Sequence, residues 1–364
     1  MTDYPPQGFA RVITDATLRN FRGFKSAELH NCKLINVIMG RNATGKSTLL
    51  EAIFACLGKP GDFISRFHVQ RSMAVGGPTT LEADAAFWSD FFFDGDLSKT
   101  IEISLEGDAN HKRSVQISYD QTKGFMPFNQ PPQTAPIPAT QPWLVSPATL
   151  QYAYNNKTET VYLAPIPTLQ NYVPLGTDIL AAAAAFFPAA ASSLSEAVDR
   201  YSRLLATDEH HQLVTELKEQ FNFIEEIDVV APFGVPSLYV KIRGLKTRQQ
   251  LGLVSGGIAK IVAILLAIAS VPGGVVLIDE IENGIFHDRF EVLWRAVYKF
   301  ALATNTQIFA TTHSKECLEG LATASKDWED QVAFIRSVSD GPNKQFEQFS
   351  GNSIFGAMRL GDVR

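Results

Sequence analysis

Apolar and polar residues alternate in regular periods along this chain, and its first part already shows two buried elements. Residues 34–39 (LINVIM) form a continuous apolar run, which predicts a strand buried on both faces. Apolar residues at helical spacing then predict a helix over 46–57, ended by Gly58. The partly alternating stretch 11–20 predicts a further strand before this pair.

Strand and helix alternate again in the last third of the chain. The pattern predicts helices over 256–270, 288–303 and 315–323, and strands over 274–279, 307–311 and 332–336. Because strand–helix alternation is typical of parallel α/β sheets, we expect one such sheet built from both ends of the chain. The middle of the chain is then an insertion.

The insertion begins with a pattern of a different kind. Residues 79–93, 100–106 and 113–119 read as three strands, with turn signals at Asp94-Gly95 and Gly107-Asp108. This arrangement predicts an antiparallel meander, distinct from the parallel sheet.

The rest of the insertion combines a proline-rich stretch with two helices. Residues 124–156 carry no charge and many prolines, and we interpret them as a loop or semi-rigid strap. Amphipathic helices are predicted over 193–206, where Ser193 and Glu196 have capping-box spacing, and over 208–221. Strands follow at 227–231 and 237–243. No repeat or heptad run occurs in the sequence, which excludes a long coiled-coil arm.

These patterns predict an α/β fold: a mixed sheet with an antiparallel β meander and a helical insertion, in a single domain spanning 1–364. Its expected segments are a first half of the core at 11–60, an antiparallel subdomain at 79–120, a Pro-rich insertion at 121–160, a helical and strand insertion at 161–245, a second half of the core at 250–340 and a C-terminal tail at 341–364.

Composition narrows the function classes. Hydrophobic residues make up 45% of the 364 residues, so a large core is available and global disorder is excluded. The net charge of -6 excludes nucleic-acid binding by bulk charge, so any contact with DNA needs a local patch. The best candidates for that patch are Lys241, Arg243, Lys246 and Arg248.

Cysteines and apolar stretches indicate the compartment. The 3 cysteines are far apart in the sequence, which excludes a disulfide scaffold and a cysteine-rich zinc site. The apolar stretch 179–191 is broken by Pro188 and the stretch 258–271 contains Lys260, and both fall short of the roughly 20 residues that span a bilayer. The N-terminal residues lack signal-peptide character. We therefore expect a soluble, cytoplasmic protein without a membrane partner.

The clearest chemical motif is a glycine-rich loop between the first buried strand and the first helix. It fits G-x-x-x-x-G-K-[ST], and its predicted nucleotide-binding residues are Gly40, Arg41, Asn42, Ala43, Thr44, Gly45, Lys46, Ser47 and the following Thr48. Backbone N–H groups of such a loop surround phosphate oxygens at a helix N-terminus. We expect Lys46 to reach the β- and γ-phosphates and the Ser47 hydroxyl to bind Mg²⁺. The loop predicts a P-loop NTPase fold.

Two carboxylates follow the apolar run Val275–Ile278. Asp279 and Glu280 are expected at the C-terminal edge of a buried strand, where ligands bind in open α/β sheets. Asp279 is predicted to hold Mg²⁺, and Glu280 to orient or deprotonate the attacking water.

A second glycine motif precedes the helix predicted over 256–270. Ser255 is a natural N-cap, and Gly256 and Gly257 allow an anion to approach that helix end closely. Two phosphate-binding elements in one chain suggest a sandwich dimer, in which each copy covers the nucleotide of the other. His313 follows the strand predicted over 307–311, where its imidazole could hydrogen-bond the γ-phosphate. His111 and the pair His210-His211 are expected on the surface.

In their order along the chain, these motifs resemble those of ABC-type ATPases. The opening Leu18–Phe24 (LRNFRGF) is similar to that of the SMC, RecF and OLD branch. DEIENGIFH and QIFATTHSKEC resemble stand-alone AAA-family ATPases related to OLD proteins, many of which are linked to DNA repair or phage defence. The resemblance covers 11–60 and 250–320 well and 80–120 loosely.

The resemblance also implies roles for single residues. It assigns Lys46 and Ser47 to phosphate and Mg²⁺, Glu280 to catalysis, Ser255 and Gly257 to the nucleotide of the partner copy, His313 to a γ-phosphate switch, and Arg22 to the flank of the nucleotide. Ile281–Gly284 resembles the D-loop. The signature motif departs from the transporter pattern at Ala259-Lys260, and Gln70 and Gln116 both remain candidates for the Q-loop residue.

Two activities are disfavoured. An OLD nuclease would continue into a TOPRIM domain with an Asp-x-Asp pair, and no such pair follows His313. The closest match to the GTPase motif, Asn156–Glu159, ends in the wrong acid and precedes the Asp279 motif.

Three hypotheses about function remain. The favoured one is an ATPase that forms a homodimer around ATP and Mg²⁺ and controls an effector or nuclease partner in repair or phage defence. The alternatives are a DNA-end-binding repair ATPase of RecF or SMC type and a nucleotide-sensing scaffold without significant turnover. A transporter subunit fits the opening motif and the meander least.

Overall fold

The structure is a computed structural model that describes residues 13–59, 63–64, 80–108, 111–128, 143–155, 157–166, 171–175, 182–189, 194–340 and 343–350. The chain divides into two compact units. Unit 1 contains Met1–Cys32, Gly40–Ala183 and Ile335–Gln348, and unit 2 contains Lys33–Met39, Ala184–Phe334 and Phe349–Arg364. Each unit thus contains segments that are far apart in the sequence.

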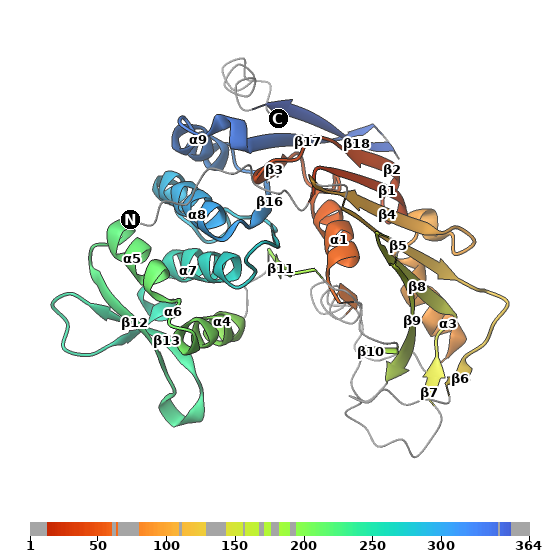
Figure 1. Cartoon of the computed structure of the whole chain (residues 1–364), viewed down its shortest axis with the longest axis horizontal. Coiled ribbons are helices and arrows are strands. Elements are labelled where there is room, and N and C mark those ends of the chain that lie inside the picture. The colour runs from red at the N-terminus through yellow and green to blue at the C-terminus, as the bar shows by residue number, and fades with distance from the viewer. Residues whose placement is uncertain are drawn as a thin grey trace. The chain divides into compact units, whose positions relative to one another are not determined.

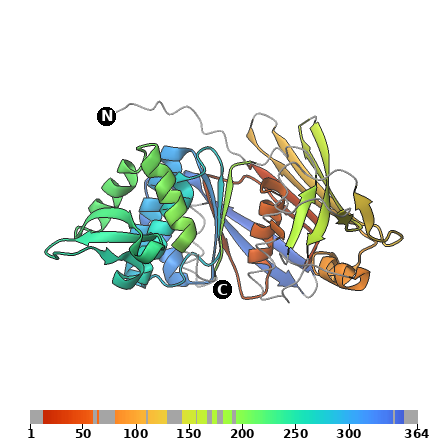
Figure 2. The same cartoon turned by 90° about the horizontal axis from the view of Figure 1, so that it is seen from below.

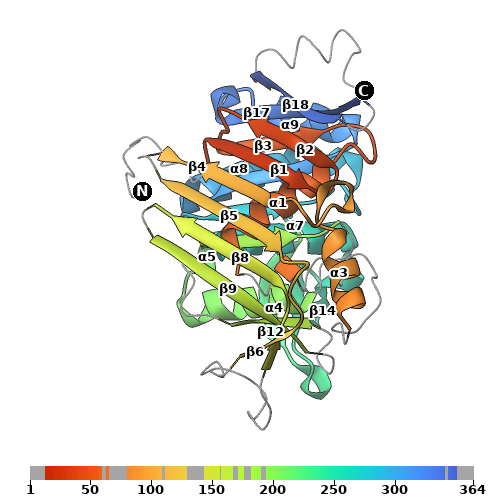
Figure 3. The same cartoon turned by 90° about the vertical axis from the view of Figure 1, so that its right-hand side faces the viewer.

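Unit 1 is built on a seven-stranded antiparallel sheet, which Figure 3 shows with its strands side by side. In spatial order the strands are β10 (Asn171–Leu175), β9 (Lys157–Ile166), β8 (Ala148–Tyr154), β5 (Lys112–Tyr119), β4 (Ile101–Glu106), β1 (Asp15–Phe21) and β2 (Phe24–Leu29). Buried and more exposed residues alternate along β4, so one face of the sheet is covered. The predicted antiparallel pairing of 100–106 with 113–119 is confirmed.

Helix α1 (Lys46–Leu57) packs on this sheet, in contact with β1, β4 and β5. All of its residues except Ser47 are buried, and Tyr152 donates a hydrogen bond from its hydroxyl to the carbonyl of Ala55. The helix predicted over 46–57 is therefore confirmed, with Gly58 as its C-cap.

The strand predicted over 79–93 is wrong. Residues Leu81–Ser89 form helix α3, and the short 3-10 turn η1 (Phe93–Gly95) follows it. Thr80 caps the helix by accepting a hydrogen bond from the backbone of Ala83, and the buried residues Asp84, Phe87 and Trp88 recur at helical spacing. Burial at this helical spacing, rather than β propensity, decides the local structure here.

The charge-free stretch 124–156 also differs from the predicted loop. It contains the paired strands β6 (Met126–Phe128) and β7 (Trp143–Val145) and all of β8, which pairs with β5 over its whole length. Residues 129–142 lie outside the described part of the chain. Pairing with neighbouring strands satisfies the backbone hydrogen-bonding groups of this segment, although its composition alone suggested a strap.

Unit 2 contains a parallel sheet made from both ends of the chain. Its strands lie in the order β11 (Ala184–Phe187), β15 (Val275–Ile278), β16 (Gln307–Thr312) and β3 (Ile35–Met39), and all three neighbouring pairs are parallel. Strand β3 is buried along its whole length, as predicted. Strands β17 (Val332–Asp340) and β18 (Asn343–Ser350) continue the sheet, and each has residues in both units. The predicted parallel sheet from distant segments is confirmed.

The remaining elements of unit 2 are α4 (Leu194–Ala206), α5 (His211–Gln220), β12 (Ile224–Val230), η4 (Pro232–Gly234), β13 (Ser237–Ile242), β14 (Gln249–Gln250), α6 (Leu251–Val254), α7 (Gly256–Ala269), η5 (His287–Arg289), α8 (Phe290–Thr304), α9 (Lys315–Ala324) and η6 (Glu329–Gln331). Helices α7, α8 and α9 lie beside the parallel sheet and pack against one another in sequence order (Figure 1). Figures 1 and 2 show the β12–β13 hairpin beside helices α4 and α5.

The predicted helices and strands of this region are present, with shifts of a few residues at their ends. The predicted cap residue Ser193 lies outside the described residues. Among the helices of the described part, none has the length and apolar character that a membrane crossing requires.

Candidate functional site

The phosphate loop of unit 1 has the backbone geometry that its glycines suggest. Gly40, Ala43 and Gly45 have positive φ values of 151°, 64° and 101°. A Cβ on Gly40 would lie 2.6 Å from the carbonyl oxygen of Ser337, and one on Gly45 would collide with the Phe24 ring. The two glycines are therefore required by close packing as well as by backbone conformation.

Lys46 lies over this loop. Its side chain is buried, and its Nζ donates hydrogen bonds to the carbonyls of Gly40 (2.8 Å) and Arg41 (2.9 Å). The Thr44 hydroxyl donates to the Arg41 carbonyl at 2.9 Å, and the Ser337 hydroxyl donates to the Thr44 carbonyl at 2.9 Å. A buried ammonium at the N-terminus of α1 makes the loop cationic, which fits the phosphates of a nucleotide.

The other residues of the motif differ in exposure. Arg41, Asn42 and Ala43 are exposed, Ser47 is half-buried at the start of α1, and Thr48 is buried. Exposed residues at the turn and a half-buried hydroxyl on the second helical residue suit a phosphate and a cation that enter from solvent.

Arg22 occupies a more enclosed position than its predicted place beside a nucleotide suggests. Its guanidinium lies 3.0 Å from the carboxylate of Glu51 on α1, both side chains are buried, and the Phe91 ring centroid is 5.1 Å away. Glu51 comes one helical turn after Ser47. Glu51 was not among the predicted site residues, although an acid at that spacing on a largely apolar helix is a usable signal.

In unit 2, the two carboxylates predicted to act on Mg²⁺ and water follow β15. Asp279 is buried, and its Oδ1 accepts a hydrogen bond of 2.6 Å from the Thr311 hydroxyl on β16. Its backbone N–H donates to the Phe187 carbonyl of β11 at 2.8 Å. Asp279 is thus fixed between the two neighbours of its strand.

Glu280 has a left-handed backbone, with φ of 47°, which is uncommon for a residue that is not glycine. Its N–H donates to the Thr311 hydroxyl at 2.8 Å, and its carbonyl accepts a 2.9 Å hydrogen bond from Lys260 on α7. The Asn283 amide donates to its Oε2. Three side chains from three segments therefore hold this turn, and such strain is characteristic of functional sites.

His313 is held by Glu282, a residue of the D-loop-like segment Ile281–Gly284. The buried Glu282 accepts a 2.8 Å hydrogen bond from the His313 backbone N–H through Oε1, and the same oxygen lies 2.9 Å from His313 Nδ1. Since Glu282 binds Nδ1, Nε2 is the ring nitrogen left to meet a ligand, and the His313 side chain is 47% exposed. The signal in the sequence was the acid two positions after Glu280.

The second glycine motif forms the start of α7. The Ser255 hydroxyl caps the helix by accepting a 3.3 Å hydrogen bond from the Ile258 N–H. A Cβ on Gly256 would meet nothing within 4 Å, whereas one on Gly257 would lie 3.0 Å from the carbonyl oxygen of Gly284. The motif therefore packs closely against the D-loop-like segment at Gly257, whereas there is free space around Gly256.

The remaining sequence candidates do not join these clusters. Gln70 lies outside the described residues, and Gln116 is exposed on β5. The four cations proposed as a DNA-binding patch lie at one end of the β12–β13 hairpin, near three acids, Glu225, Glu226 and Asp228. Arg248 contacts both Glu226 and Asp228, Arg243 lies 3.8 Å from Glu225, and Lys241 donates to the Leu245 carbonyl. The acids therefore pair with two of the four cations, Arg243 and Arg248.

The half-buried Lys260 leads us to predict that the free energy of unfolding depends on pH. Burial lowers the pKa of its ammonium from 10.5 to about 8, and the attraction of Glu282 and Glu280 opposes that shift. Between these pH values the unfolded chain holds a proton that the folded chain has lost, so stability should rise with pH. The difference corresponds to about 3 kcal/mol of unfolding free energy.

Denaturant unfolding across this pH range tests the prediction. The Lys260→Met variant keeps the apolar stem and lacks the titrating group, so its unfolding free energy should lose this rise. Parallel pH profiles of the two proteins would contradict the assignment.

The fold and the loop geometry are typical of P-loop proteins, and comparison with known proteins narrows the class. An AAA-domain model matches residues 16–135, and a second model, described as "AAA domain, putative AbiEii toxin, Type IV TA system", matches residues 158–319. The solved SMC head bound to the C-winged helix domain of ScpA has a TM-score of 0.50 at 12% identity, over 94% of this chain and 99% of that chain. This likeness supports the predicted P-loop ATPase fold.

Relatives in sequence agree with that class. An ATP/GTP phosphatase of Helicobacter pylori is 24% identical over 353 residues, which cover 88% of this chain and 91% of that protein. The DNA replication and repair protein RecF of Nitrosococcus oceani is 48% identical over 42 residues, 12% of each chain. These matches support an ABC/AAA ATPase of the SMC and RecF type, as the motifs predicted.

Proposed function

We propose that this chain binds ATP with Mg²⁺, hydrolyses it to ADP and phosphate, and uses the cycle of dimer formation and release as a switch. The observation that carries the proposal is the phosphate loop with its buried Lys46 ammonium, bonded to the carbonyls of Gly40 and Arg41. The name of the Helicobacter pylori relative, an ATP/GTP phosphatase, supports nucleotide hydrolysis.

Each group of site residues has one role in the proposed reaction. Lys46 and the loop N–H groups bind phosphate, while Ser47 and Asp279 hold Mg²⁺, which offsets phosphate charge when bound. Glu280 orients and deprotonates water, and His313, positioned by Glu282, meets the γ-phosphate through Nε2. The left-handed backbone at Glu280 fixes the direction in which its side chain leaves the main chain. This supports a specific role for its carboxylate.

Dimer formation is supported by exposed apolar side chains beside the second glycine motif. Leu253 is 83% exposed and Phe286 68% exposed, and the segments that carry them meet where Gly257 approaches Gly284. Large apolar side chains exposed next to a candidate phosphate element are typical of an interface. We propose a second copy of this chain as the partner, with Ser255, Gly256 and Gly257 against its nucleotide.

The proposed output is control of an effector or nuclease partner in DNA repair or phage defence, as in the OLD-related ATPases that the motifs resemble. Direct action on DNA ends is the second candidate, which the short RecF match favours. The acids paired with Arg243 and Arg248 weigh against the predicted basic patch. Salt-dependent binding to a DNA duplex would favour the second candidate, because phosphate contacts weaken steeply with salt.

The Glu280→Gln variant tests the proposed hydrolysis. Glutamine keeps the size of the side chain and one carbonyl acceptor but cannot take a proton from water, so hydrolysis should fall about 10²-fold or more while ATP still binds. Because bound ATP persists, a longer-lived dimer should form with ATP and Mg²⁺. Phosphate release and light scattering measure the two effects.

The wild-type protein is the control for this experiment. Equal turnover of the two proteins would remove Glu280 from catalysis, and negligible turnover in both would favour the nucleotide-sensing scaffold. A Glu280→Gln protein that stays monomeric with saturating ATP would contradict the sandwich.

Phe286 provides a test of the interface alone. Replacement by serine should weaken the ATP-dependent dimer of the Glu280→Gln protein, and leave the folded monomer as stable as before, because the ring is largely exposed. Val235→Ser is a matched control, since Val235 is 65% exposed in the turn before β13. Sedimentation with ATP measures the dimer constant. Equal dimerisation of the Phe286 and Val235 variants would place the interface elsewhere.

A further inference from the structure

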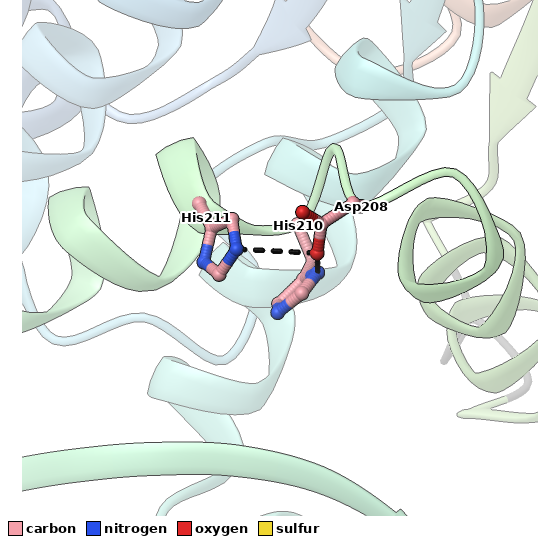
Figure 4. Close-up of side chains that lie close together, drawn as sticks. All are labelled: Asp208, His210 and His211. Atoms are coloured by element: carbon pink, nitrogen blue, oxygen red, sulfur yellow. Dashed lines mark ion pairs between the residues drawn. The ribbon is translucent and has the colours of Figure 1, made fainter.

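We infer that Asp208, His210 and His211, at the turn between α4 and α5, form a site for one divalent transition-metal ion of the Zn²⁺ class. None of the three is among the residues assigned to ATP or Mg²⁺. Figure 4 shows the carboxylate of Asp208 joined by dashed ion-pair lines to both imidazoles. The sequence alone suggested only surface histidines.

The distances suit a shared ion. His211 Nε2 lies 3.2 Å and His210 Nδ1 3.8 Å from Oδ1 of Asp208, and one ligand atom from each residue lies within 4.8 Å of the others. Zinc–nitrogen and zinc–oxygen bonds of about 2.0–2.1 Å in a tetrahedron separate neighbouring ligand atoms by about 3.3 Å. The two separations from the Asp208 oxygen, 3.2 and 3.8 Å, are close to this value.

An ordinary ion pair explains only part of the cluster. His211 pairs with Asp208, but Nδ1 of His210 is buried and lacks a hydrogen-bond partner among the described residues. At 3.8 Å from the carboxylate it is too distant for a hydrogen bond. A buried polar nitrogen without a partner is costly, and an ion between the three side chains would satisfy it.

The chain already holds these ligands in place. Asp208 has a left-handed backbone with φ of 63°, and the N–H groups of Asp208 and Glu209 donate to the carbonyls of Leu205 and Leu204 at 3.2 and 2.9 Å. The His210 ring packs edge-on against Tyr201, with centroids 6.2 Å apart. A pre-formed turn lowers the ordering cost of binding.

The ligand types select the class of ion. Two imidazoles and one carboxylate favour Zn²⁺, Co²⁺, Ni²⁺ or Cu²⁺ over Mg²⁺ and Ca²⁺, which prefer oxygen ligands. Asp208 and His211 have side chains that are 80% and 70% exposed, so solvent or a partner's side chain can complete the coordination. The ion would brace the turn that joins α4 to α5.

Calorimetric titration of the tag-free full chain with Zn²⁺, in excess Mg²⁺ and without nucleotide, tests the inference. We expect one equivalent to bind and to raise the thermal unfolding midpoint, because an ion that binds only the folded state stabilises it. His211→Gln and Asp208→Asn should each lose this binding and the thermal shift. Both replace exposed side chains, and asparagine tolerates the left-handed backbone of Asp208.

His30→Gln is the matched control. His30 also lies between two carboxylates, 3.0 Å from Asp15 and 3.5 Å from Glu28, but this cluster has a single imidazole. The control should bind zinc as the wild type does. Substoichiometric binding to the wild type, binding that survives in both His211→Gln and Asp208→Asn, or loss confined to His30→Gln would each overturn the inference.

Discussion

Replacing Lys46 with alanine is expected to abolish ATP binding and ATP hydrolysis together. The Lys46 ammonium is buried over the loop, where it bonds the carbonyls of Gly40 and Arg41. No other lysine belongs to the loop motif, and water cannot supply a fixed positive charge in its place. Titration with a fluorescent ATP analogue and an assay of phosphate release measure the two losses.

Two further variants separate charge from structure. Lys46→Met keeps the buried apolar stem and removes the ammonium, so it should lose binding as completely as the alanine variant. Lys25→Ala removes an exposed lysine of β2 in the same unit and should bind and hydrolyse ATP normally. Turnover near the wild-type rate in Lys46→Met would remove the phosphate-loop assignment.

The phosphate loop and the elements around it could be predicted because their signals are local. An apolar run, a glycine motif and helical periodicity follow one another within 34–57, and the structure places β3 and α1 there. The same holds for β15, whose four apolar residues precede Asp279 directly. In each case a contiguous segment contains its own pattern of burial.

Elements that depend on distant partners were harder to predict. Strand β8 lies in a proline-rich stretch, and only its pairing with β5 and β9 makes it a strand. Helix α3 was predicted as a strand, whereas its buried Asp84 accepts a 2.8 Å hydrogen bond from the Ser146 hydroxyl, 62 positions further along the chain. The residues of such a segment alone do not show which distant strand or side chain it will contact.

The residues of the candidate site also fall into two groups, those that a local motif predicts and those that distant segments contribute. Motif residues such as Lys46 and Glu280 could be predicted by their spacing, whereas the side chains that hold them could not. Thr311 binds both Asp279 and Glu280 from the neighbouring strand, and Glu282 positions His313. These partners are 31 or 32 positions apart in the sequence, so only the fold brings them together.

A mixing experiment tests whether the second glycine motif acts on the nucleotide of a partner copy. The Gly256→Asp chain should be inactive alone, because its carboxylate would face the partner's triphosphate, and like charges close together repel strongly. A Cβ at Gly256 meets nothing within 4 Å and its φ is not left-handed, so the substitution fits the fold. Gly256→Asn has the same shape without the charge and should keep more of the activity.

The Lys46→Ala chain has the opposite defect, since its Ser255–Gly257 motif is intact and its phosphate loop is not functional. A mixture of the two inactive chains should therefore contain heterodimers with one complete site. That site holds ATP on the loop of the Gly256→Asp chain, covered by the glycine motif of the Lys46→Ala chain. Phosphate release should partly return, and it should follow the concentration of heterodimer, which differently tagged chains allow us to measure.

Three results would argue against action in trans, and they have different meanings. Hydrolysis by the isolated Gly256→Asp monomer would exclude the model, because a chain that completes its own site needs no partner. No recovery in proven heterodimers, with ATP still bound by the Gly256→Asp chain, would indicate that both sites must be intact at once. Equal losses in Gly256→Asn and Gly256→Asp would assign the motif a structural role, because shape rather than charge would then decide the activity.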